Sequence, residues 1–277
     1  MQSSTAAKDK IIVPLDVPTA QAARELIEAI GGTVGFFKVG NQLFTAAGPD
    51  IVREVRASGS KVFLDLKFHD IPNTVRHAVE SASALGVDML TIHLSGGRAM
   101  CEAAVVGRGI SNVLILGVTV LTSLNDVALS EIGFRGTVED EVLLLAELAK
   151  KVGITGLVAS PQELGVLRER FGSIFTTVIP GIRPTWSESG DQQRILTPRQ
   201  AVEAGADYLV IGRPITASAN PKTAVQRIVD ELERQPSWWQ KVGQMSRVFQ
   251  VQATGRFEVE DFAKPIKKLA GVSGTGR

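Results

Sequence analysis

The sequence predicts a (β/α)8 barrel followed by a C-terminal extension. Three observations lead to this fold class. The chain has 277 residues, of which 44% are hydrophobic and 21% charged, as in a globular protein that is large enough for one α/β barrel. Eight short runs rich in Val, Ile and Leu recur between residues 11 and 213. Amphipathic helical patterns separate these runs, as expected when helices cover parallel strands.

The strands are expected where an apolar run is bounded by Gly, Pro or polar residues. Eight segments meet this description, which is the number that a (β/α)8 barrel requires. In chain order they are IIVPLDV (11–17), FFKVG (36–40), KVFLDLK (61–67), DMLTIH (88–93), NVLILGVTVL (112–121), GLVAS (156–160), TTVIPGI (176–182) and DYLVIGR (207–213).

The segments between the strands include clear helical patterns with apolar residues on one face. A doubly wound open sheet is the alternative architecture for such a chain. The first β-α turn, VPLDVPTA (13–20), lacks the Gly-rich phosphate-binding fingerprint of dinucleotide-binding sheets, which favours the barrel. The clearest helical patterns are TAQAARELIEAI (19–30), PDIVREVRAS (49–58), EDEVLLLAELAKKV (139–152) and PKTAVQRIVDELER (221–234).

The chain divides into an N-terminal tail (1–10), the catalytic barrel (11–234) and a basic extension (235–277). The extension holds seven Lys or Arg against three Asp or Glu. It could be a solvated segment, a strip packed on the barrel through Trp238 and Trp239, or a segment that recruits RNA, a membrane or another enzyme.

Composition points to a small-molecule partner in the cytoplasm. The net charge is +1, so no overall field favours nucleic acid or a membrane surface. No run approaches the roughly 20 apolar residues of a membrane span, and the first ten residues lack the apolar core of a signal peptide. The one cysteine, Cys101, cannot form an internal disulfide and is expected to be a small buried residue.

Charged residues gather at the carboxyl ends of the predicted strands, where such barrels build their active sites. Asp65 and Lys67 are two residues apart, so on a strand they point to the same side. Lys38 ends the neighbouring strand, Asp16 ends the first strand, and Asp70 follows shortly after Lys67. We expect an alternating set of charges, Lys38, Asp65, Lys67 and Asp70. A structural ion-pair network is the alternative, but burying four charges at this face for stability alone would be costly.

The ends of the seventh and eighth strands are suited to phosphate, which barrels of this class commonly bind there. Arg183 follows the seventh strand, and the segment IGRP (211–214) offers Arg213 together with backbone N–H groups. The polar loop PTWSESGDQQ (184–193) is suited to a lid that orders over a ligand, with an ordinary solvent loop as the alternative.

The segment FLDLKFHDIPNT (63–74) resembles the D-x-K-x-x-D signature of the orotidine 5'-phosphate decarboxylase family, in its bacterial form. The resemblance covers about residues 10–234. Its further matching segments are PLD (14–16), KVG (38–40), VTVLTS (118–123), PGIRP (180–184), GDQQRILTP (190–198) and DYLVIGRPIT (207–216).

This resemblance implies a cofactor-free and metal-free decarboxylase that converts orotidine 5'-monophosphate to UMP and CO2 in pyrimidine biosynthesis. By the resemblance, Lys67 donates the proton to C6 of the pyrimidine and Asp65 lies against the scissile carboxylate. Lys38 and Asp16 hold the ribose hydroxyls. Asp70 completes the catalytic set of Lys67, Asp65 and Lys38.

The resemblance further implies a homodimer with shared sites, in which Asp70 and Thr74 reach across the interface. Thr122 would contact the orotate ring. The groups implied in phosphate binding are Gln192, Arg213, the Gly212 amide and Arg183.

The nearest alternative is a magnesium-dependent sugar-phosphate decarboxylase or aldolase of the same barrel superfamily, which has a similar motif. Against a metal, His69, His77 and His93 lack the spacing of a metal site. Each acidic residue of the motif also has a lysine neighbour that would repel a cation.

Overall fold

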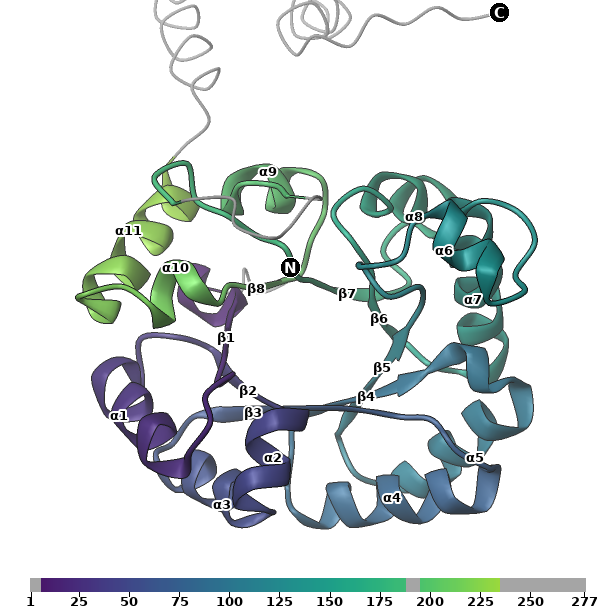
Figure 1. The fold of residues 1–277 in the computed structure, drawn as a ribbon, viewed down its shortest axis with the longest axis horizontal. Helices are drawn as coiled ribbons and strands as arrows, with labels where there is room; N and C mark the ends of the chain where they lie inside the picture. Colours follow the sequence, from purple (N-terminus) through teal and green to yellow (C-terminus); the bar gives the residue numbers. More distant parts are fainter. Residues whose placement is uncertain (1–5, 188–194, 235–277) are drawn as a thin grey trace, which may run out of the picture. The chain divides into compact units, whose positions relative to one another are not determined.

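The computed structural model describes residues 6–187 and 195–234. Eight parallel strands pair in chain order and close into a barrel, because β1 pairs with both β2 and β8. Figure 1 shows the strands as an inner ring with the helices around it. Closure confirms the predicted fold class and excludes the open sheet. The strands are β1 (Ile11–Pro14), β2 (Phe36–Gly40), β3 (Lys61–Phe68), β4 (Met89–His93), β5 (Leu114–Val118), β6 (Gly156–Val158), β7 (Thr176–Ile179) and β8 (Tyr208–Val210).

The helices lie where the apolar periodicity indicates, and all four of the clearest patterns form helices, as α1, α3, α7 and α11. Short helices and two 3-10 turns complete the connections. The helices are α1 (Ala20–Ile30), α2 (Asn41–Ala47), α3 (Asp50–Ala57), α4 (Pro72–Ala84), α5 (Arg98–Arg108), α6 (Asp126–Glu131), α7 (Val138–Val152), α8 (Leu164–Phe171), α9 (Pro198–Glu203), α10 (Arg213–Thr216) and α11 (Pro221–Glu233), with 3-10 turns η1 (Ala7–Lys10) and η2 (Leu94–Gly96).

Side-chain caps fix where several helices begin. Thr19 accepts a hydrogen bond from the backbone N–H of Ala22 at the start of α1. Thr137 and Asp140 form a reciprocal capping box at the start of α7, which satisfies backbone donors that have no partner within the helix. Pro72 occupies the first position of α4, where its missing N–H carries no cost.

The core has two layers on either side of the barrel wall. Alternate residues of the strands point outward against the helices, as Val62 and Leu64 of β3 do. The residues between them point inward, and Phe63 is the β3 member of this inner layer. The next inward positions along β3 are therefore 65 and 67. The inner layer consists of Ile12, Phe36, Phe63, Met89, Leu116 and Val178.

Several strands are shorter than their apolar runs, mainly at the carboxyl end. The run 11–17 pairs only as far as Pro14, and the run 112–121 only from Leu114 to Val118. Leu15 and Thr119 each still donate one backbone hydrogen bond to the neighbouring strand, and the residues beyond them form the loops at the mouth of the barrel. The expected extension 235–277 lies outside the described residues. In the part of the chain that the structure describes, no helix is both long enough and apolar enough to cross a membrane.

Candidate active site

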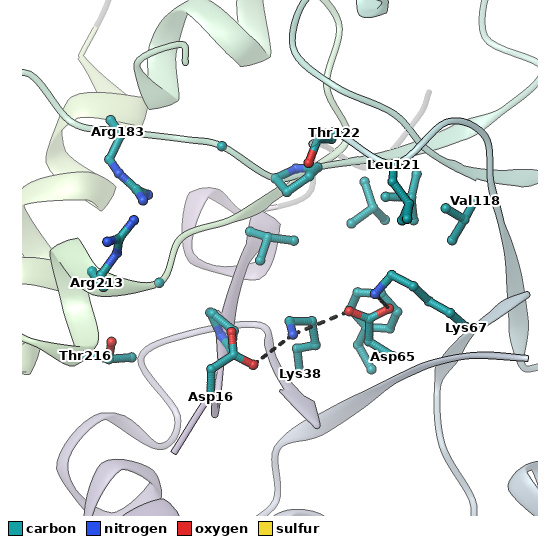
Figure 2. Close-up of a pocket in the computed structure, with 18 of the residues that line it drawn as sticks. Asp16, Lys38, Asp65, Lys67, Val118, Leu121, Thr122, Arg183, Arg213 and Thr216 are labelled. Carbon is teal, nitrogen blue, oxygen red and sulfur yellow. Dashed lines mark hydrogen bonds and ion pairs between the residues drawn. The ribbon is translucent and has the colours of Figure 1, made fainter. Parts of the chain in front are cut away.

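A cavity of about 560 Å³ opens at the carboxyl ends of the strands. It collects eight of the residues that the sequence singles out, from six different strands or the loops that follow them. Figure 2 shows its side chains. The eight residues are Asp16, Lys38, Asp65, Lys67, Thr122, Arg183, Gly212 and Arg213.

Asp65 lies between two lysines. One carboxylate oxygen is 2.8 Å from Lys67 Nζ and the other is 3.4 Å from Lys38 Nζ. Lys38 Nζ also lies 3.0 Å from Asp16 Oδ1. Asp65 is only 9% exposed, so these contacts replace most of its hydration. The result is an alternating row of charges, Asp16, Lys38, Asp65 and Lys67, with no net charge.

Asp65 is held in its ionised form. Burial by itself would raise the pKa of its carboxyl group. The positive charges of Lys38 and Lys67, with hydrogen bonds from Lys67 and Thr91, outweigh burial and bring the pKa below its usual value. The carboxylate therefore remains charged throughout the neutral range.

Gly40 provides the space that the Lys38 ammonium occupies. It lies two residues beyond Lys38 on β2 and is paired with Asp65 of β3. A Cβ at this position would lie 3.1 Å from Lys38 Nζ and 3.3 Å from Asp16 Oδ1. A side chain at this position would therefore crowd both groups and displace them by a few tenths of an ångström.

Thr91 of β4 belongs to this cluster, although the sequence analysis did not single it out. Its hydroxyl donates to Asp65 Oδ1 at 3.0 Å and accepts from the backbone N–H of Lys67 at 2.9 Å. It is fully buried. The signal in the sequence is weak, since Thr91 is one polar residue inside the apolar run DMLTIH, and threonine is common in strands.

Arg183 and Arg213 lie on another side of the cavity. In Figure 2 their guanidinium groups point toward each other and lie apart from the Lys38, Asp65 and Lys67 side chains. Arg183 is 6% exposed, and its backbone N–H donates to Leu196 O at 2.9 Å. Arg213 is the first residue of α10, directly after Gly212. Two guanidinium groups at one place offer the charged, directional donors that suit a phosphate group.

An apolar wall accompanies the two charged regions. Figure 2 shows Val118 and Leu121 near the Lys67 side chain. Such a wall lowers the local dielectric constant and strengthens the electrostatic interactions of the nearby ammonium group. The apolar lining residues are Phe63, Val118, Val120, Leu121, Val158, Val178 and Val210.

Asp70 and Thr74 lie outside this chain's cavity, and both are exposed. Asp70 Oδ1 accepts from the backbone N–H of Ile71 at 2.6 Å, and Ile71 is itself 67% exposed. Within one chain, Asp70 is thus not the fourth member of the expected charge row; Asp16 extends the row at its other end. Gln192 lies outside the described residues.

The histidines are near the site without forming a ligand group. The rings of His69 and His93 are 5.3 Å apart. Burial, His69 and Lys67 together lower the pKa of His93, so its ring is neutral at pH 7. His77 contacts Arg76 on α4. Among the described residues, no group of three or more His, Cys, Asp or Glu could hold a metal ion.

Comparisons with known proteins agree with this geometry. Residues 9–228 match the model of the orotidine 5'-phosphate decarboxylase / HUMPS family. A relative from Syntrophotalea carbinolica, named orotidine 5'-phosphate decarboxylase, is 50% identical over 234 residues, covering 82% of this chain and 96% of the relative. A relative of the same name from Moorella thermoacetica is 49% identical and covers 82% and 93%. The crystal structure of orotidine 5'-phosphate decarboxylase from Lactobacillus acidophilus superposes with a TM-score of 0.72 at 37% identity, covering 81% of this chain and 99% of that one.

Proposed function

Because the chain belongs to the orotidine 5'-phosphate decarboxylase / HUMPS family, we propose that it is a carboxy-lyase that converts orotidine 5'-monophosphate to UMP and CO2 in pyrimidine biosynthesis. One observation carries the proposal: Lys67 Nζ lies 2.8 Å from Asp65 in a cavity that also presents Arg183 and Arg213. An ammonium group and a phosphate-binding pair in one cavity suit a substrate that is both a pyrimidine acid and a phosphate ester.

The ammonium group of Lys67 has the central role. When the bond between C6 and the carboxyl carbon breaks, its electron pair stays on C6, where the pyrimidine ring cannot delocalise it. The nearby ammonium stabilises this developing charge. It then transfers a proton from Nζ to C6, which gives UMP, and the resulting amine regains a proton from solvent.

Asp65 contributes less to the rate of decarboxylation than Lys67 does. A substrate carboxylate 4 Å from the Asp65 carboxylate would be repelled by at most about 4 kcal/mol at an effective dielectric constant of about 20. Relieving that repulsion accounts for roughly three powers of ten in rate. Decarboxylation to an undelocalised carbanion needs far more than this, so stabilisation by Lys67 dominates.

The other cavity residues bind the nucleotide. Asp16 and Lys38, joined at 3.0 Å, hold the two ribose hydroxyls in this proposal, and Thr122 contacts the orotate ring. The phosphate is bound by the groups of the loops after β7 and β8, namely Arg183, Arg213, the Gly212 amide and Gln192.

Replacing Lys67 tests the assignment directly. The Lys67→Ala variant should lose turnover, which is followed as the decrease of orotate absorbance. It should still bind UMP in calorimetry, because the residues that bind the phosphate are unchanged. A matched control is Lys151→Ala on the exposed surface of α7, which should keep full turnover. Unchanged turnover in Lys67→Ala would contradict the role of this residue.

The magnesium-dependent sugar-phosphate enzymes are the remaining alternative. We propose that no cofactor or metal takes part, so orotidine 5'-monophosphate should be consumed at the same rate in excess EDTA. A rate that falls in EDTA and returns with added magnesium would favour the alternative. We also propose that the enzyme acts in the cytoplasm.

We further propose a homodimer in which Asp70 and Thr74 reach the partner subunit's cavity. Their exposure, together with that of Ile71, supports this arrangement. Co-expressed Lys67→Ala and Asp70→Ala chains would form mixed dimers with one intact site, so activity should recover to about a quarter of the wild-type value. If each variant alone is inactive and dimeric, and the mixed dimers still recover no activity, the two subunits do not share their active sites.

A further inference from the structure

We propose that Thr91, on β4, is a positioning residue that fixes Lys67 and Asp65 relative to each other for the reaction. The proposal rests on the function proposed above and adds a residue to its machinery. Thr91 does not line the cavity, so it acts through the two residues that do.

The hydroxyl of Thr91 is bonded on both sides. A hydroxyl group has one hydrogen to donate and lone pairs to accept. Here the hydrogen is directed to Asp65 Oδ1 at 3.0 Å, and the oxygen accepts from the backbone N–H of Lys67 at 2.9 Å. One group thus binds the side chain of the acid and the main chain of the lysine. Because Thr91 is fully buried, water is not in place to substitute for either bond.

The backbone of Lys67 needs such a partner. Lys67 has φ 51°, and it is the one non-glycine residue with positive φ in the described ranges. This left-handed conformation is unfavourable for a residue with a Cβ. The regular pairing of β3 with β4 is also broken there, because Leu64 pairs with Leu90 but the next paired residue of β3 is Phe68, opposite Ile92. The Thr91 hydroxyl takes the place of the missing ladder bond.

The same hydroxyl determines how Asp65 meets the ammonium group. Asp65 Oδ1 accepts both from Thr91 and from Lys67 Nζ, the latter at 2.8 Å. With Thr91 occupying one lone-pair direction, the ammonium is confined to the remaining one, on the cavity side. The hydrogen bond from Thr91 also contributes to the low pKa of Asp65, so its loss should raise that pKa.

Thr177 of β7 provides a matched control. It is 1% exposed, and its hydroxyl also bonds to a carboxylate, Asp207 Oδ2, at 3.1 Å. Asp207 directly precedes β8, so this pair lies at the amino end of the strands, opposite the cavity. Thr177→Val therefore removes the hydroxyl of a buried threonine, with its partly buried bonds to Asp207 and Arg168, and leaves the cavity lining untouched.

The test compares Thr91→Val, Thr91→Ser and Thr177→Val in the full chain. Thr91→Val keeps the shape and loses the hydroxyl, so kcat should fall about 10- to 100-fold while KM stays within about threefold. The acidic limb of its kcat–pH profile should move to higher pH, because the more basic Asp65 is protonated earlier as the pH falls. Thr91→Ser should restore most of kcat and return the acidic limb to its wild-type pH. Thr177→Val should lower the melting temperature and leave the limb in place.

Three outcomes would overturn the proposal. In the first, Thr91→Val keeps kcat within about twofold of the wild type. In the second, kcat falls without movement of the acidic limb. In the third, Thr91→Ser fails to rescue. If the Val variant does not fold, Thr91→Ala takes its place under the same criteria. Failure of the proposed function is separate, because the wild-type protein itself would then leave orotidine 5'-monophosphate unchanged in the same assay.

Discussion

Replacing Lys67 by glycine should leave a more stable protein than replacing it by alanine. Both substitutions remove the same charge and the same contact with Asp65, so these losses cancel in the comparison. What differs is the Cβ atom at φ 51°. Alanine in this left-handed conformation costs about 1–2 kcal/mol, whereas glycine costs roughly 0.5–1 kcal/mol of extra chain entropy on folding.

The difference should favour Lys67→Gly by about 1 kcal/mol in the free energy of unfolding. For a domain of this size that corresponds to a melting temperature about 2–4 °C higher. Urea unfolding followed by circular dichroism, with equal slopes for the two variants, gives the free-energy difference. Calorimetry gives the temperature difference independently.

Lys61, the first residue of β3, provides the control pair. It pairs with Phe36 of β2 and is not among the residues with positive φ. There Lys61→Ala should be more stable than Lys61→Gly by about 0.5–1 kcal/mol, which is the opposite order. If Lys67→Ala equals or exceeds Lys67→Gly in stability, the reasoning about strain at position 67 is wrong.

Three further predictions concern glycines in helices, a helix cap and a buried thiol. Gly107→Ala in α5 should destabilise the protein, because the added Cβ would lie 2.3 Å from Arg76 O of α4. Gly165→Ala in α8 adds a Cβ that meets nothing within 4 Å, so it should raise the free energy of unfolding by up to about 1 kcal/mol. Urea unfolding of both variants measures the two effects. Thr137→Ala removes the capping box of α7 and should cost about 1 kcal/mol, visible as a lower melting temperature. Burial, followed by the charge of a neighbouring glutamate, raises the pKa of Cys101 to about 11, so a thiol reagent at pH 8 should modify the folded protein far more slowly than the urea-unfolded one; equal rates would show that the thiol is accessible.

The fold and much of the cavity could be predicted because both follow from local patterns. Eight apolar runs separated by helical periodicity lead to a closed parallel barrel. Alternation along a strand places positions 65 and 67 on the same side, and both residues do line the cavity. Strand ends were less predictable, since apolar residues such as Val120 and Leu121 continue past the last ladder bond into a loop that lines the cavity.

Features that depend on pairing between strands could not be read from the sequence. The role of Thr91 arises from the break in register between β3 and β4, and nothing in either segment alone indicates that break. Asp70, by contrast, was predicted to join the charge row and does not. The prediction rested on its nearness to Lys67 in the chain, but at Asp70 the chain has left β3 and the side chain is exposed.

The pairing of charges in the row of Asp16, Lys38, Asp65 and Lys67 has a consequence for how fast a ligand arrives. Seen from beyond a Debye length of roughly 8–10 Å, two positive and two negative groups cancel. The row therefore adds little to the long-range attraction of a phosphorylated ligand, and its lysines act at short range, after the ligand has entered the cavity.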